Sequence, residues 1–252
     1  MAAQNHDHLD VEDYMASLGV DMLHPGGMER SEELARMCHV TSDCHVLDVG
    51  CGYGRTGRFL ASKFGCKVTG IDISGKMISQ GRRKISEEGL DDRVALYQMP
   101  TETMDFPDGT FDAIISEGML VFVDKRTVLR QMVRVCRSGG RIGLNELSWM
   151  KDPPERLIER SVQDLQGVRP LTYDGWIRLM QGAGISDVVD HRYRYKSASF
   201  NVIISIGLRS MLRVTKRCLI DSEVRHWVSR QERLFRKYSD YWGYGLYAGI
   251  KS

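Results

Sequence analysis

The chain has 252 residues, a net charge of +2 and 42% hydrophobic residues, which suits one α/β domain with insertions. It holds no run of 18 apolar residues, and residues 1–10 are too polar for a signal segment, so we expect a cytoplasmic protein without a membrane span. Its six cysteines show no C-x-x-C spacing, so we expect reduced thiols and no metal, although a site built from distant cysteines stays open.

Charge is distributed unevenly along the chain. Residues 192–252 hold thirteen Lys/Arg and four Asp/Glu, about +9, so residues 1–191 carry about −7. We interpret the basic tail as the solvated faces of two long helices. An acidic partner, a membrane surface or an anionic substrate remains an alternative.

The N-terminal part predicts a helical lead. Residues 10–20 indicate a short helix that carries Tyr14, and Pro25 with two glycines makes 23–27 a loop. A helix over Ser31–Cys38 then leads to the first strand, which we expect at His45–Val49.

A glycine-rich turn follows this strand and organises the rest of the chain. Gly50, Gly52 and Gly54 let the backbone bend sharply and approach a ligand closely, and 56–63 read as a helix. A helix start beside such a turn suits an anionic ligand group. The dinucleotide pattern G-x-G-x-x-G fails because Arg55 occupies its sixth position, and no Gly-Lys-Ser/Thr ends the turn as in a phosphate loop. Instead, Asp48 precedes G-x-G-x-G by two residues and can face the ammonium of an amino acid.

This stretch resembles motif I of the class I S-adenosylmethionine (SAM)-dependent methyltransferases, and it is most similar to the small-molecule branch that includes the ubiquinone and menaquinone biosynthesis enzymes. The resemblance covers roughly residues 20–190. It implies an α/β fold with a doubly wound, mostly parallel seven-stranded sheet and helical cap insertions, with SAM as cofactor. It also implies that the lead, residues 1–40, folds over the cofactor pocket, which makes Tyr14 and His24 candidates to line the site. A structural role for His24 stays open.

Residues 66–73 predict the second strand, which ends at Asp72 and Ile73. An acid at the carboxyl end of this neighbouring parallel strand can accept hydrogen bonds from both ribose hydroxyls. In the family that this chain resembles, the next apolar residue packs on adenine. Ser74 can cap the following helix, where Met77 lies near the adenine or simply packs in the core.

The third and fourth strands are expected at 94–98 and 111–118. The resembled family places an acid for the adenine amino group where this chain has Pro100, so Thr101 or Glu102 must replace it. Glu117 stands at the exit of the fourth strand, where it contacts SAM, acts as a base or is merely solvated. Residues 127–136 predict a helix, and 142–147 the fifth strand, which ends near Glu146.

Residues 149–171 predict a lid insertion that selects the substrate, and Trp149 opens it. Thr172 is a predicted helix cap, and 185–195 read as the sixth strand. A helical insertion over 199–240 separates it from the seventh strand at 241–250. The inserted helices 201–220 and 222–238 pack on their own domain, form a homodimer face or contact a membrane peripherally.

The resemblance implies a SAM-dependent methyltransferase that moves a methyl group to an O, N, S or C nucleophile of a small molecule by in-line displacement, and we expect it to be cytoplasmic. An RNA or protein acceptor is the alternative, although the fourth strand lacks an Asn-Pro-Pro-Tyr motif and we expect no nucleic acid. A non-catalytic SAM-binding protein is a second alternative.

The candidate residues fall into three groups. The catalytic candidates are Glu117 and His24. The cofactor candidates are Asp48, Gly50, Cys51, Gly52, Gly54, Asp72, Ile73, Met77, Pro100, Thr101 and Glu117. The substrate candidates are Tyr14, His24, Glu146 and Trp149.

Overall fold

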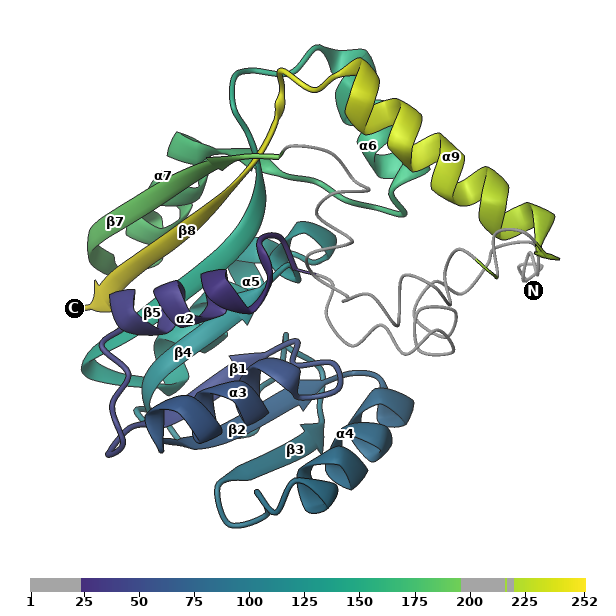
Figure 1. Ribbon diagram of the computed structural model, residues 1–252. Coiled ribbons are helices and arrows are strands. Elements are labelled where there is room, and N and C mark those ends of the chain that lie inside the picture. Colours follow the sequence, from purple (N-terminus) through teal and green to yellow (C-terminus); the bar gives the residue numbers. More distant parts are fainter. Residues whose placement is uncertain (1–23, 196–215, 217–219) are drawn as a thin grey trace, which may run out of the picture.

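The central element of the fold is a β-sheet, which runs from β3 at one edge to β7 at the other in Figure 1. The computed structural model describes residues 24–195, 216 and 220–252. The strands are β1 (His45–Val49), β2 (Lys67–Asp72), β3 (Val94–Gln98), β4 (Phe111–Glu117), β5 (Cys136–Trp149), β6 (Leu171–Thr172), β7 (Ile185–Arg194) and β8 (Trp242–Lys251). Their order is β3-β2-β1-β4-β5-β8-β7, and β6 pairs with the end of β5. The pairs from β3 to β5 are parallel, whereas β8 runs antiparallel to both its neighbours. This topology confirms the predicted doubly wound, mostly parallel sheet.

Helices cover both faces of this sheet. They are α2 (Gly27–Met37), α3 (Arg55–Phe64), α4 (Gly75–Glu87), α5 (Lys125–Val135), α6 (Glu155–Asp164), α7 (Tyr173–Gly182) and α9 (Ser222–Lys237), with a 3-10 turn, η1 (Leu120–Phe122), after β4. In Figure 1, α2, α3 and α4 lie in front of the sheet, and α5 and α7 lie behind it. Two layers of helices on one sheet are what a parallel α/β fold requires, because both faces of its strands are apolar.

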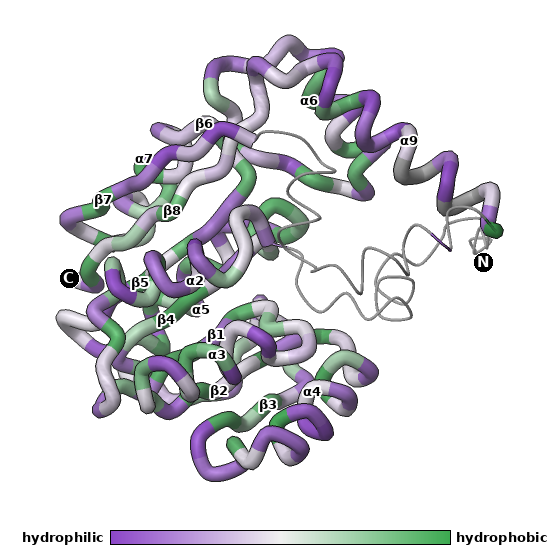
Figure 2. Tube along the Cα trace, in the orientation of Figure 1, coloured by the Kyte–Doolittle hydropathy of each residue, from purple (hydrophilic) through white to green (hydrophobic). Residues whose placement is uncertain are grey.

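The alternation of side chains along the strands creates two separate cores. In β1, Val46 packs with Leu34 of α2 and Leu60 of α3, whereas the next residue, Leu47, packs with Leu129 of α5 on the other face. Figure 2 shows the resulting concentration of hydrophobic residues in the central strands and the more hydrophilic course of α9.

Several predicted boundaries agree closely with the structure. β1 and β3 span the residues that we predicted, and α9 begins at Ser222. The side chain of Ser74 caps α4 by accepting from the Met77 amide, and that of Thr172 caps α7 by accepting from the Gly175 amide. The helix expected at 10–20 lies outside the described residues, and so does 201–220 except for 216 and 220.

The fifth strand is longer than predicted. It begins at Cys136, not at 142, because Cys136 already pairs with Phe111 of β4. The ladder then shifts register between Phe111 and Ala113, and Arg137 donates to the carboxylate of Asp112 at this irregularity (2.7 Å). Gly139 and Gly140 therefore lie in a bulged strand.

The two insertions between β5 and β8 meet each other. α6 of the 149–171 insertion packs on α9 of the 199–240 insertion. The α9 side chain of Phe235 packs against Trp242 at the start of β8, with ring centroids 4.6 Å apart and the ring planes tilted by 51°. No helix in the described part of the chain is both long and apolar enough to cross a membrane.

Candidate functional site

The glycine turn has the left-handed backbone that its composition predicts. Gly50, Gly52 and Gly54 have φ angles of 75°, 52° and 67°, values that residues with a Cβ rarely adopt. The amides of Gly50 and Cys51 both donate to the carbonyl of Ile71 in β2, at 2.9 and 3.0 Å. The turn is therefore tied to the neighbouring strand at the carboxyl edge of the sheet.

Asp72 organises the next part of this edge. Its carboxylate accepts from the amide of Gly52 (2.8 Å) and from the amide of Ser74 (2.9 Å), which joins the glycine turn to the start of α4. Beside it, the side chain of Ile73 is 66% exposed, whereas Met77 is buried. The end of β2 thus presents a fixed carboxylate next to an open apolar side chain.

Asp48 is a buried acid with an incomplete set of partners. Its side chain accepts from the amide of Gly57 in the first turn of α3, while its Oδ2 atom has no hydrogen-bond partner among the described residues. Burial, and then the charges of Glu117 and Asp72, raise the pKa of the Asp48 carboxyl well above its ordinary value. A cation beside Oδ2 would reverse this shift.

Glu117, at the end of β4, is the centre of a buried polar cluster. Ser31 of α2 donates to both its carboxylate oxygens (3.1 and 3.0 Å), and Thr56 of α3 donates to Oε2 (2.9 Å). Asn145 of β5 donates to Oε1 (3.0 Å), and Nδ1 of His24 lies 3.4 Å from the same atom. The lead, the glycine turn's helix and two strands therefore converge on one carboxylate.

Comparisons with known proteins agree with this geometry. Residues 46–140 match the family described as "Methyltransferase domain". The sarcosine/dimethylglycine N-methyltransferase of Halorhodospira halochloris is 35% identical over 52% of this chain and 47% of its own length. An uncharacterized protein of Haemophilus influenzae is 27% identical over 69% of this chain and 71% of its own length. The fold matches that of Haemonchus contortus phosphoethanolamine N-methyltransferase 2, solved with phosphomonomethylethanolamine and S-adenosylhomocysteine, with a TM-score of 0.73 at 19% identity over 94% of this chain and 56% of that one.

Residues 46–140 are thus similar to a methyltransferase domain, and the fold is that of a methyltransferase solved with S-adenosylhomocysteine, the product of the cofactor SAM. The chain spans only about half the length of the named relative, so this similarity does not identify a methyl acceptor.

The residues at the carboxyl edge fit that cofactor. Among the described residues, a Cβ placed on Gly52 would meet only the sulfur of Met77, at 3.7 Å, so no other described atom crowds the front of the turn. The unpartnered Oδ2 of Asp48 and the fixed carboxylate of Asp72 flank this turn, and both suit a ligand that carries an ammonium group and ribose hydroxyls. Cys51 is buried in the turn, and its burial raises the pKa of the thiol, so it contributes its backbone rather than a reactive sulfur.

Three of the four predicted substrate residues, His24, Glu146 and Trp149, have buried side chains. Glu146 is completely buried and accepts from the amides of Met119 and Leu120. Trp149 is 3% exposed and packs against Trp242, with ring centroids 4.3 Å apart. Tyr14 lies outside the described residues, and His24 belongs to the Glu117 cluster.

Pro100, which stands where the resembled family has an acid, lies close to Asp72. The amide of Met99 donates to the Asp72 carbonyl (2.9 Å), which brings the end of β3 beside the end of β2. Pro100 itself is exposed, whereas Thr101 is buried and its hydroxyl donates to the Glu102 carboxylate (3.3 Å). Thr101 and Glu102 thus form a polar pair at the position of the missing acid.

Sequence reasoning did not identify Ser31, Thr56 or Asn145 as site residues. Each is a polar residue among apolar neighbours on the buried side of its element, and this was the available signal. Their common partner could not be inferred because 86, 61 and 28 positions separate them from Glu117.

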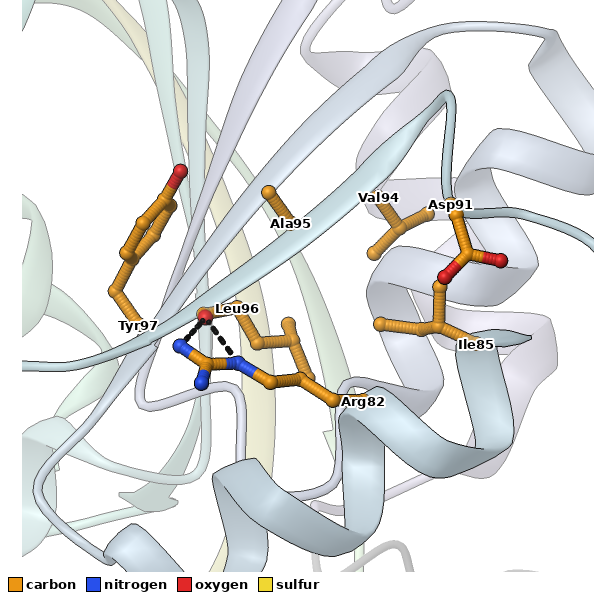
Figure 3. A pocket seen from close by; sticks show the side chains of 7 residues that line it. All are labelled: Arg82, Ile85, Asp91, Val94, Ala95, Leu96 and Tyr97. Carbon is orange, nitrogen blue, oxygen red and sulfur yellow. Dashed lines mark hydrogen bonds between the residues drawn. The ribbon is translucent and has the colours of Figure 1, made fainter. Parts of the chain in front are cut away.

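A hollow of about 220 Å³ lies elsewhere, against the edge strand β3 (Figure 3). The guanidinium of Arg82 in α4 donates to the Leu96 carbonyl there, at 2.7 and 3.0 Å, and so occupies an acceptor of the open sheet edge. β3 is two strands away from the glycine turn of β1, so this hollow is a feature of the sheet edge, not of the candidate site at the glycine turn. Among the described residues, no group of three potential ligands could hold a metal ion.

Proposed function

We propose that this protein transfers the methyl group of SAM to a nucleophilic atom of a small molecule. One observation carries the proposal: the glycine turn, Asp72 and the Glu117 cluster lie together at the carboxyl edge of the parallel strands, where α/β folds bind their ligands. The match to an enzyme named for sarcosine and dimethylglycine supports a small acceptor.

Each residue at the turn receives a role in holding the cofactor. Asp72 accepts from the ribose hydroxyls, and Asp48 faces the ammonium group, whose charge would compensate its buried carboxyl. The backbone of Gly50–Gly54 receives the carboxylate of the ligand at the start of α3. Ile73 and Met77 enclose the adenine, and the Thr101–Glu102 pair serves its amino group in place of the acid that Pro100 replaces.

His24 and Glu117 face the acceptor side. Bound SAM supplies an electrophilic methyl group. Glu117 holds His24 in place rather than acting as the base itself, because its oxygens already accept from Ser31, Thr56 and Asn145. His24 receives a proton from the acceptor. The lead that carries Tyr14 and the insertions with α6 and α9 would enclose the acceptor and exclude water.

The decisive experiment is a calorimetric titration with S-adenosylhomocysteine, and NADH serves as the control ligand. We expect micromolar binding of S-adenosylhomocysteine alone, followed by turnover of labelled SAM on small amines, phenols and thiols. Absence of binding, or equal binding of NADH, would overturn the proposal. Binding without turnover on any acceptor would favour a SAM-binding protein without catalysis.

Replacing Asp72 by alanine tests the assignment of the ribose. We expect at least a tenfold loss of affinity for S-adenosylhomocysteine, because two hydroxyl acceptors and the brace on the Gly52 amide are lost together. Asp105→Ala, on an exposed loop, is the matched control and should bind like the wild type. An unchanged affinity of Asp72→Ala in calorimetry would remove the ribose assignment.

A further inference from the structure

Glu146 has surroundings that differ from those of a surface carboxylate. Its side chain is fully buried on β5, and it points to the face of the sheet opposite that of its neighbour Asn145. Oε1 accepts from the amides of Met119 (3.1 Å) and Leu120 (2.8 Å), whereas Oε2 has no hydrogen-bond partner among the described residues. Glu146 thus fastens the segment that follows β4 to the middle of the sheet.

That segment, residues 118–122, touches the glycine turn. A Cβ placed on Gly50 would lie 2.6 Å from Cγ and 2.9 Å from Cβ of Met119, so the Met119 side chain rests directly on Gly50. The same segment borders the lead at Gly118, where a Cβ would lie 3.3 Å from the Cα of His24. A displacement of Met119 would therefore free the turn to change shape.

A carboxyl group is a costly way to fasten a loop at this place. Burial raises the pKa of Glu146 to about 8, although the amides of Leu120 and Met119 and the nearby Lys125 act in the opposite direction. An apolar residue would avoid this cost but would leave the partly buried Met119 amide and the buried Leu120 amide without an acceptor. The acceptor oxygen, rather than the charge, is the property that the loop uses.

We propose that Glu146 is a positioning residue for the cofactor: through its hydrogen bonds to residues 119 and 120, it keeps Met119 pressed on Gly50 and so holds the glycine turn in its ligand-binding shape. The inference rests on the proposed function, since it concerns the affinity of the same turn for the adenosyl cofactor. It assigns Glu146 an action through Met119 in place of a contact with the acceptor.

The test measures binding of S-adenosylhomocysteine by calorimetry, and so it needs no knowledge of the acceptor. Glu146→Leu, which removes the acceptor oxygen, should lower the affinity about tenfold. Glu146→Gln, which keeps an oxygen for both amides, should stay within about twofold of the wild type. Glu159→Leu makes the same chemical change on the exposed face of α6 and should have no effect.

Met119→Ala provides the second arm, which remains informative if Glu146→Leu does not fold. This variant should also lose affinity several-fold. The double variant Glu146→Leu/Met119→Ala should lose no more affinity than the single variant with the larger loss. Wild-type affinity in Met119→Ala, or in a folded Glu146→Leu, would overturn the inference and return Glu146 to the acceptor side. Multiplying losses in the double variant would also overturn it, because the two residues would then act independently. If the wild type itself does not bind, the proposed function fails instead.

Discussion

At the scale of single residues, two of the buried carboxyl groups in the described part of the chain differ in purpose. Asp48 and Glu146 each have one oxygen without a hydrogen-bond partner among the described residues. Asp48 lies beside the open turn, where a cationic ligand group can reach it, whereas Glu146 lies beneath the 118–122 segment. The first is therefore suited to binding and the second to positioning.

Glu146 also predicts a dependence of stability on pH. Its pKa is about 8 in the folded protein and near 4.5 when the chain is unfolded. Between these values the unfolded chain loses a proton that the folded protein keeps, so the wild type loses stability as pH rises from about 4.5 to 8. Glu146→Gln does not titrate, and we expect it to be more stable than the wild type by on the order of 3 kcal/mol at pH 8.5 and by much less at pH 4.5. Urea unfolding at both pH values measures this difference, and a constant difference would contradict it.

At the scale of elements, α2 connects the site to the far edge of the sheet. Ser31 on its buried side reaches Glu117, while Arg30 and Glu33 reach Tyr193 of β7. The Tyr193 hydroxyl accepts from Arg30 (2.7 Å) and donates to Glu33 (2.5 Å), and the Arg30 guanidinium lies 4.5 Å from the centre of the tyrosine ring. This contact fixes the helix that presents Ser31 and follows His24.

Tyr193→Phe tests the connection between α2 and β7. It retains the ring and its packing, but it removes the hydroxyl that joins Arg30 to Glu33. We expect a loss of about 1 kcal/mol in the free energy of unfolding, which corresponds to roughly 2–4 °C in Tm for a chain of this size. Tyr97→Phe, on the exposed side of β3, is the control. Equal Tm values for the two variants would show that the hydroxyl contributes nothing.

The elements themselves could largely be predicted from the sequence, whereas the contacts between them could not. Short runs of β-prone residues located β1 and β3, and the hydroxyls of Ser74 and Thr172 located two helix starts, because these signals are local. The start of β5 was missed because the register shift at Asp112 depends on a partner strand. The cluster around Glu117 was missed for the same reason, since hydrogen bonds between distant residues leave no pattern in a single sequence.

At the scale of the whole molecule, β8 holds together the two parts of the sheet. It lies between β5 and β7, pairs with both, and contributes the fully buried Trp242 and Tyr247. Without it, β7 would have no neighbour in the sheet and the long edge of β5 would be open.

Removal of β8 should therefore prevent folding rather than merely weaken it. We expect a chain that ends at residue 241 to lose near-UV circular dichroism and to aggregate in gel filtration, because it exposes apolar surface along β5. A chain that lacks only Ser252, which is exposed, should behave like the full protein. A soluble, cooperatively unfolding protein of 241 residues would contradict this expectation.

The position of β8 also sets an order of events during synthesis. The strands from β1 to β5 pair with partners that a ribosome has already made or makes soon afterwards, so this part of the sheet, with the glycine turn, can form on the growing chain. β7 must wait, since its partner follows the whole 199–240 insertion. The side of the sheet that carries the glycine turn is thus built first, and a nascent chain exposes the edge of β5 until β8 has been translated.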